Sequence, residues 1–113
     1  MILPRDVAVL QALSKLLLDK RLSQLRRAAE LREQSRMQIA ALDVRPEPTD
    51  LGLAAAEQVA MRYQRWADVR RAELNTVLAR QTADWLAARE EARLAFGKGE
   101  ALRGIAARLT GQR

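Results

Sequence analysis

The sequence predicts an all-α fold in which two long helices pack as an antiparallel, coiled-coil-like hairpin and the second helix is the longer one. Apolar residues recur at steps of three and four along both halves of the 113-residue chain, which is the spacing of one helix face. Near the middle, Pro46 and Pro48 interrupt this pattern, because proline lacks an amide donor and clashes with the preceding helical turn. We expect a single domain, residues 1–113.

The first helix is predicted to span residues 5–43. Pro4 suits the start of a helix, since the amide that proline lacks would have no partner there. The apolar stripe is broad as far as Leu18 and becomes thinner afterwards. Four arginines lie in or beside the thinner part: Arg26, Arg27, Arg32 and Arg36.

A short turn at residues 44–49 is expected to follow, and then a second helix over residues 50–109. Asp50 is a good N-cap, because its carboxylate can accept hydrogen bonds from the free amides of the first helical turn. Gly97, Gly99 and Gly104 lie inside the second helix, and glycine costs roughly 1 kcal/mol relative to alanine there. The sequence therefore predicts a bend or a frayed joint near these glycines.

A hairpin folded at the two prolines would place Leu42 beside Leu51 or Leu53, and both Leu10 and Leu17 beside the segment 77–85. Residues beyond about Glu90 would then extend past the first helix, and apolar surface exposed in this way commonly binds a partner. The side chains concerned are Leu94, Phe96, Leu102, Ile105 and Leu109. The mean step of both stripes is close to the period of a straight helix, so we expect no strict heptad and weak supercoiling.

The composition argues against an enzyme. The chain has no cysteine and no histidine, which excludes thiolate and imidazole chemistry and the metal sites built from those groups. Its acidic residues are interspersed with arginines along both helices, the pattern of a solvated helix surface. We therefore expect no catalytic residues, no metal site and no cofactor.

The amino-terminal segment lacks the features of a secretory signal, because Arg5, Asp6 and Lys15 interrupt its apolar residues. No apolar run in the sequence approaches the length of a membrane-spanning helix. We expect a cytoplasmic protein.

The net charge of +6, from 20 basic and 14 acidic residues, favours contact with acidic partners, nucleic acid among them. Tyr63 and Trp66 lie among arginines, and aromatic side chains in such a strip can stack on bases. The arginines of this strip are Arg62, Arg65, Arg70 and Arg71. The interpretation we favour is that Tyr63 packs between the helices and Trp66 borders it, since arginine stems commonly cover apolar surface.

Self-association is a third hypothesis. A two-helix hairpin buries little core, and oligomerisation is a usual remedy for a small core. A homo-oligomer is compatible with binding of a protein partner and with binding of nucleic acid.

The sequence predicts an amphipathic helix that begins within a few residues of Met1, then a short turn and a longer second helix. Together with the stretch WLAAREEARLAFGKGEAL, from Trp85 to Leu102, this plan resembles the FliJ/YscO family, the central stalk proteins of flagellar and type III secretion export ATPases. Gly97, Gly99 and Gly104 depart from the uninterrupted second helix expected in that family.

The resemblance implies a non-enzymatic stalk or adaptor that modulates ATP hydrolysis in its partner. It implies that the paired terminal ends bind the hexameric export ATPase and that the hairpin end faces the export gate, which places the protein peripheral to the inner membrane. By position, the residues implied at the ATPase end are Leu10, Leu13, Leu17, Leu94, Phe96 and Leu102. Those implied at the gate end are Arg36, Met37, Leu53 and Met61.

Overall fold

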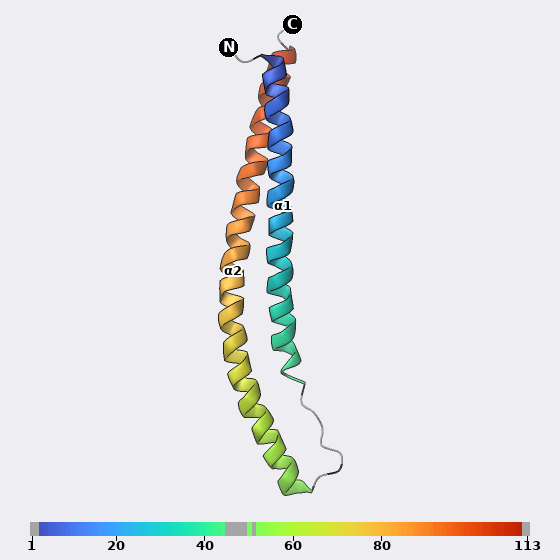
Figure 1. The fold of residues 1–113 in the computed structure, drawn as a ribbon, viewed down its shortest axis with the longest axis vertical. Coiled ribbons are helices and arrows are strands. Elements are labelled where there is room, and N and C mark those ends of the chain that lie inside the picture. The colour runs from blue at the N-terminus through green and yellow to red at the C-terminus, as the bar shows by residue number, and fades with distance from the viewer. Residues whose placement is uncertain (1–2, 45–49, 51, 112–113) are drawn as a thin grey trace. The chain divides into compact units, whose positions relative to one another are not determined.

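The computed structural model describes residues 3–44, 50 and 52–111. These residues form two helices, α1 (Pro4–Ala41) and α2 (Leu53–Gly111), and no strand (Figure 1). The helices contain 38 and 59 residues. An all-α helical hairpin with a longer second helix, as the sequence predicts, is therefore confirmed.

The chain divides into two compact units, and each unit contains part of both helices. Unit 1 comprises Met1–Ala29 and Asp84–Arg113, and unit 2 comprises Glu30–Ala83. Within each unit the two helical segments are antiparallel, because the later a residue stands in α1, the earlier its neighbour stands in α2. In unit 1, Pro4 and Thr110 line one cavity, whereas Arg21 pairs with Glu91.

The start of α1 follows the sequence-based expectation. Pro4 is the first helical residue, and the carbonyl of Leu3 accepts the first helical hydrogen bond from the amide of Val7 at 3.1 Å. The amide of Leu3 in turn donates to Asp6 Oδ2 at 3.4 Å. An acidic side chain that reaches back to the residue before the helix is half of a capping box, so Asp6 helps to fix where α1 begins.

The end of α1 is earlier than predicted, at Ala41 and not at residue 43. Beyond it, the amides of Leu42 and Asp43 bond to the carbonyls of Ile39 and Ala40, each at 3.1 Å. These bonds span three residues, the tighter pattern with which many helices finish. Of the predicted turn at 44–49, only Val44 lies within the described residues.

The second helix begins at Leu53 and not near Asp50. The carbonyl of Gly52 accepts the first helical hydrogen bond, from the amide of Ala56 at 2.9 Å, which makes Gly52 the N-cap. Glycine is an acceptable residue there because it adopts the non-helical backbone without strain. Asp50 precedes the cap and lies in a bend.

Most of the residues that face between the helices follow a seven-residue repeat, although Tyr63, which also packs there, lies outside it. Eleven of the thirteen buried and half-buried positions of α1 and its end alternate steps of four and three, with Leu17 and Ala29 half-buried beside them: Val7, Gln11, Ser14, Leu18, Arg21, Leu25, Ala28, Arg32, Ser35, Ile39 and Leu42. In α2 the same alternation runs through Ala67, Arg71, Leu74, Leu78, Gln81, Trp85, Ala88, Ala92, Ala95, Gly99, Leu102, Ala106 and Leu109. We call these positions the seam. The expectation of no heptad was wrong, because the apolar stripe of the sequence includes residues beside the seam; a seven-residue repeat is the pattern of left-handed coiled coils.

The register of the pairing also differs from the prediction. Leu42 packs with Ala67 and Leu74, whereas Leu53 is 80% exposed and Leu51 lies outside the described residues. Leu18 lines a groove with Phe96 and not with residues 77–85. Consequently the carboxy-terminal part of α2 does not extend past α1, because Asp84–Arg113 pack against Met1–Ala29 in unit 1. The exposed end of α2 is its first three turns, residues 53–62.

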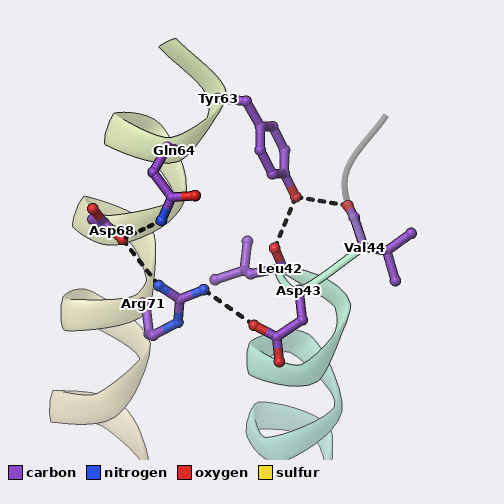
Figure 2. A network of polar contacts seen from close by, with 7 residues as sticks. All are labelled: Leu42, Asp43, Val44, Tyr63, Gln64, Asp68 and Arg71. Atoms are coloured by element: carbon purple, nitrogen blue, oxygen red, sulfur yellow. Dashed lines mark hydrogen bonds and ion pairs between the residues drawn. The ribbon is translucent and has the colours of Figure 1, made fainter. Parts of the chain in front are cut away.

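In unit 2, hydrogen bonds and ion pairs tie the end of α1 to α2. Figure 2 shows the Tyr63 hydroxyl directed at the carbonyl oxygens of Leu42 and Val44, each 3.0 Å away. Carbonyls at a helix end lack hydrogen-bond donors within the helix, and the Tyr63 hydroxyl is the donor here. The guanidinium of Arg71 lies between Asp43, at 3.3 Å, and Asp68, at 3.1 Å. The prediction that Tyr63 packs between the helices is confirmed.

The glycines of α2 do not interrupt it. The helix continues through Gly97, Gly99 and Gly104 to Gly111, so the expected frayed joint is absent from the described residues. At Gly99 an added Cβ would lie 3.3 Å from Ser14 Oγ, whereas Gly97 has nothing within 4 Å. Close packing at the seam explains a small residue at position 99, and packing against α1 offsets the intrinsic cost of glycine in a helix.

We predict that Gly97→Ala stabilises the protein by about 0.5–1 kcal/mol, because alanine loses less backbone entropy on folding and meets no neighbour here. Gly99→Ala should gain less, since Ser14 Oγ must move. Urea denaturation followed by circular dichroism measures both. A Gly97→Ala variant no more stable than the parent would contradict the continuous helix.

We also predict that Leu74→Ala destabilises the protein by about 2–5 kcal/mol, the usual cost of emptying a buried leucine site. Leu74 is 4% exposed and packs with Leu42 and Ala67. Val77→Ala, one turn away and 38% exposed against 4% for Leu74, is the matched control and should cost less, about 1 kcal/mol. Equal losses of urea stability in the two variants would show that Leu74 is not in a core.

Candidate protein-interaction surface

Most large apolar side chains of the described residues lie outside the seam. The buried apolar residues are few and half of them are alanines: Val7, Leu42, Ala67, Leu74, Ala92 and Ala95. The exposed large apolar residues are Leu3, Val9, Leu10, Leu13, Leu16, Leu22, Leu31, Met37, Val44, Leu53, Val59, Met61, Trp66, Val69, Val77, Leu86, Leu94 and Phe96. Single exposed leucines are ordinary, but clusters of them mark binding surfaces.

The seam itself carries polar contacts between the helices. In unit 2, the Ser35 hydroxyl donates to Gln81 Oε1 at 2.5 Å, and Arg32 Nε donates to Thr82 Oγ1 at 3.1 Å. In unit 1, Arg21 lies 3.6 Å from the Glu91 carboxylate. Polar pairs between helices add little net stability, but they disfavour other alignments in which their groups would lack partners.

The residues predicted for the ATPase end all belong to unit 1. Leu10, Leu13, Leu94 and Phe96 are exposed, whereas Leu17 and Leu102 are half-buried. Leu102 occupies a seam position. Leu10, Leu13 and Leu17 share one side of α1, because they are three and four residues apart. The set is therefore partly surface and partly seam.

The residues predicted for the gate end all belong to unit 2. Arg36, Met37, Leu53 and Met61 are exposed, and Arg36 forms an ion pair with Glu33 at 3.7 Å. Leu53 and Met61 lie in the first turns of α2, ahead of the point where Tyr63 meets the end of α1. Of these two, Leu53 is also predicted from the sequence to pack beside Leu42, which its 80% exposure contradicts.

A groove in unit 1 was not foreseen from the sequence. Lys15 and Asp19 of α1 line it together with Glu100 and Arg103 of α2, and Phe96 and Gly99 lie between them. The four charges balance, so the groove attracts neither anions nor cations strongly. Its lining includes the seam residue Gly99, where the helices approach so closely that an added Cβ would lie 3.3 Å from Ser14 Oγ.

The arginine strip around Trp66 is partly occupied by contacts within the protein. Arg70 pairs with Glu73 at 3.3 Å, and Arg71 pairs with Asp43 and Asp68. Trp66 is 55% exposed, with its ring centroid 5.7 Å from that of Tyr63. Trp66 therefore borders the interhelical packing while most of its ring faces solvent.

No catalytic constellation is evident in the described part of the chain. Within those residues, no three acidic side chains gather as a metal site requires. Glu90 and Arg93 form two hydrogen bonds, of 2.7 and 2.9 Å. These bonds hold the pKa of the Glu90 carboxyl below its usual value and raise the pKa of Arg93. The pair lies on one exposed helix surface, three residues apart, so it belongs to the helix and not to a reaction site.

Comparisons of the chain with protein-family models, with curated proteins and with solved structures found no match. Neither α1 nor α2, over the residues described, is long and apolar enough to cross a membrane.

Proposed function

We propose that this chain is a non-enzymatic stalk or adaptor of a type III protein export apparatus, flagellar or virulence-related, located in the cytoplasm. One observation supports it most. Two helices of 38 and 59 residues pack through a seam in which small and polar residues outnumber large apolar ones, while most of their large apolar side chains lie outside the seam. A chain built in this way presents apolar surface along a helical scaffold, which suits protein recognition better than catalysis.

In this proposal, unit 1 binds the hexameric export ATPase. Both chain ends belong to this unit, and it carries the exposed side chains of Leu10, Leu13, Leu94 and Phe96. Arginines near these leucines suit contact with carboxylates of a partner, because a guanidinium forms paired hydrogen bonds with a carboxylate. The chain would alter the rate of hydrolysis in the ATPase and hydrolyse nothing itself.

In the same proposal, unit 2 faces the export gate. Its exposed apolar residues Met37, Leu53 and Met61 lie near the end of α1 and the start of α2. Methionine adapts to irregular apolar partners because its side chain is unbranched and flexible. Anchoring through this unit would hold the protein at the inner membrane without a segment that spans it.

We predict that the double variant Leu94→Asp with Phe96→Asp loses binding to the cognate export ATPase and loses stimulation of its ATP hydrolysis by at least about ten-fold, since a buried unpaired carboxylate opposes association. The double variant Met37→Asp with Met61→Asp is the matched control and should retain both. Pull-down and a phosphate-release assay measure the two properties. Absence of binding by the parent chain at micromolar concentration would overturn the proposal.

A second candidate function, nucleic-acid binding, is favoured by the exposed ring of Trp66 among arginines. Base stacking on an aromatic ring contributes about 1–3 kcal/mol, so a nucleic-acid-binding protein should lose about ten-fold in affinity on Trp66→Ala. Under the stalk proposal, any binding at low salt is non-specific, disappears near physiological salt and is unchanged by this variant. Fluorescence anisotropy with single-stranded and duplex probes at two salt concentrations separates the two functions.

A further inference from the structure

One side of α1 in unit 1 is an exposed apolar surface. It consists of Val9, Leu10, Leu13, Leu16 and Leu17, and we call it the leucine face. Val9, Leu10, Leu13 and Leu16 are 59%, 45%, 57% and 65% exposed, and Leu17 is half-buried. At 3.6 residues per turn, all five point within roughly 60° of the direction of Leu13. The seam residues Gln11 and Leu18 point well away from that direction, so α2 leaves this face open.

The leucine face is symmetric about Leu13. Apolar residues stand three positions away on both sides, at Leu10 and Leu16, and four positions away on both sides, at Val9 and Leu17. Seven positions away, the pattern ends in charges of opposite sign, Asp6 on one side and Lys20 on the other. Both of these side chains are exposed, and both point within roughly 20° of the direction of Leu13.

This arrangement is self-complementary in an antiparallel pair of helices. A two-fold axis through Leu13 places each residue opposite the one equally far from Leu13 in the second copy. Leu13 then meets Leu13 of the second copy. Leu10 packs beside Leu17 of the second copy, and Leu16 packs beside its Val9. Asp6 lies opposite Lys20 of the second copy. Two ion pairs of opposite direction close the two ends of the apolar contact.

We propose that the leucine face binds a second copy of this chain, with the two α1 helices antiparallel about Leu13. The hairpin has a reason to do so, because its seam buries mainly small and polar side chains and oligomerisation supplements a small core. The charges select the antiparallel alignment. A parallel pair would place Asp6 against Asp6 and Lys20 against Lys20, and opposed like charges are destabilising.

If the leucine face bound a different protein, the two halves of the face would have no reason to match each other. The match between the two halves of the face, in apolar positions and in opposite charges, is what favours a second copy. The inference does not depend on the export proposal. Leu10, Leu13 and Leu17 belong both to the leucine face and to the proposed ATPase-binding residues. The dimer and the proposed ATPase complex would therefore exclude each other.

The first test is a charge exchange measured by sedimentation equilibrium. Lys20→Asp and Asp6→Lys should each raise the dimer dissociation constant about ten-fold, because each turns two attractive pairs into repulsive ones. Lys20→Asp is the primary variant, since Asp6→Lys also removes the acceptor of the Leu3 amide. The double variant, with both substitutions, should restore dimerisation. Residues 6 and 20 are about 21 Å apart along α1, so that restoration cannot arise within one chain.

Lys15→Asp is the matched control for the charge exchange. It changes the net charge as Lys20→Asp does, but Lys15 lies in the groove of unit 1 and away from the leucine face. It should leave the dissociation constant unchanged. A parent chain that stays monomeric at several hundred micromolar, or a double variant as weak as the single ones, would overturn the proposal.

The second test is a cross-link. The chain contains no cysteine, so Leu13→Cys introduces a single thiol at the two-fold axis, and mild oxidation should convert most of the protein to a covalent dimer. Ala8→Cys is the control, because Ala8 is exposed but points roughly 140° away from Leu13. Equal cross-linking of the two variants would show random collision and contradict the proposed interface.

Discussion

The structure depends on the seven-residue repeat along which α1 and α2 meet in each unit, and in this repeat small and polar side chains outnumber large apolar ones. Helices approach closely where Ala67, Ala92 and Ala95 are buried and where Gly99 faces Ser14. Large apolar side chains occupy fewer than half of the seam positions, so apolar burial alone does not determine which residues pair. Polar contacts such as Ser35 with Gln81 then matter more, because a shifted alignment would leave their hydrogen-bonding groups without partners.

This use of small residues determines what remains on the surface. Alanines, glycine and polar residues occupy more than half of the seam, so many of the leucines and the described methionines, Met37 and Met61, lie beside it. In unit 1 they form the leucine face, and in unit 2 they include Leu53 and Met61 at the exposed start of α2. The function that we propose and the dimer that we infer both follow from this displacement of apolar residues from the core to the surface.

The sequence predicts which kinds of residue form the candidate surface better than it predicts where they lie. The absence of histidine and cysteine removes the commonest catalytic groups without any structure, and the exposed leucines of α1 belong to a stripe visible in the sequence. The stripe was interpreted as hairpin core, however. Leu13 and Leu17 lie beside the seam residues Ser14 and Leu18, so a shift of one position separates the core from the surface on a helix, and apolar periodicity does not resolve that shift.

The sequence by itself determined that there are two helices, that the break lies near Pro46 and Pro48, and that α1 begins within one residue of Pro4, because proline geometry and helical periodicity act locally. Only the tertiary structure decided the register, the seven-residue seam and the continuity of α2 through its glycines. The physical reason is that these features arise from contacts between distant residues. Tyr63 binds the carbonyl of Leu42 and Ser14 lies close to Gly99, and neither pairing is encoded in the spacing along one helix.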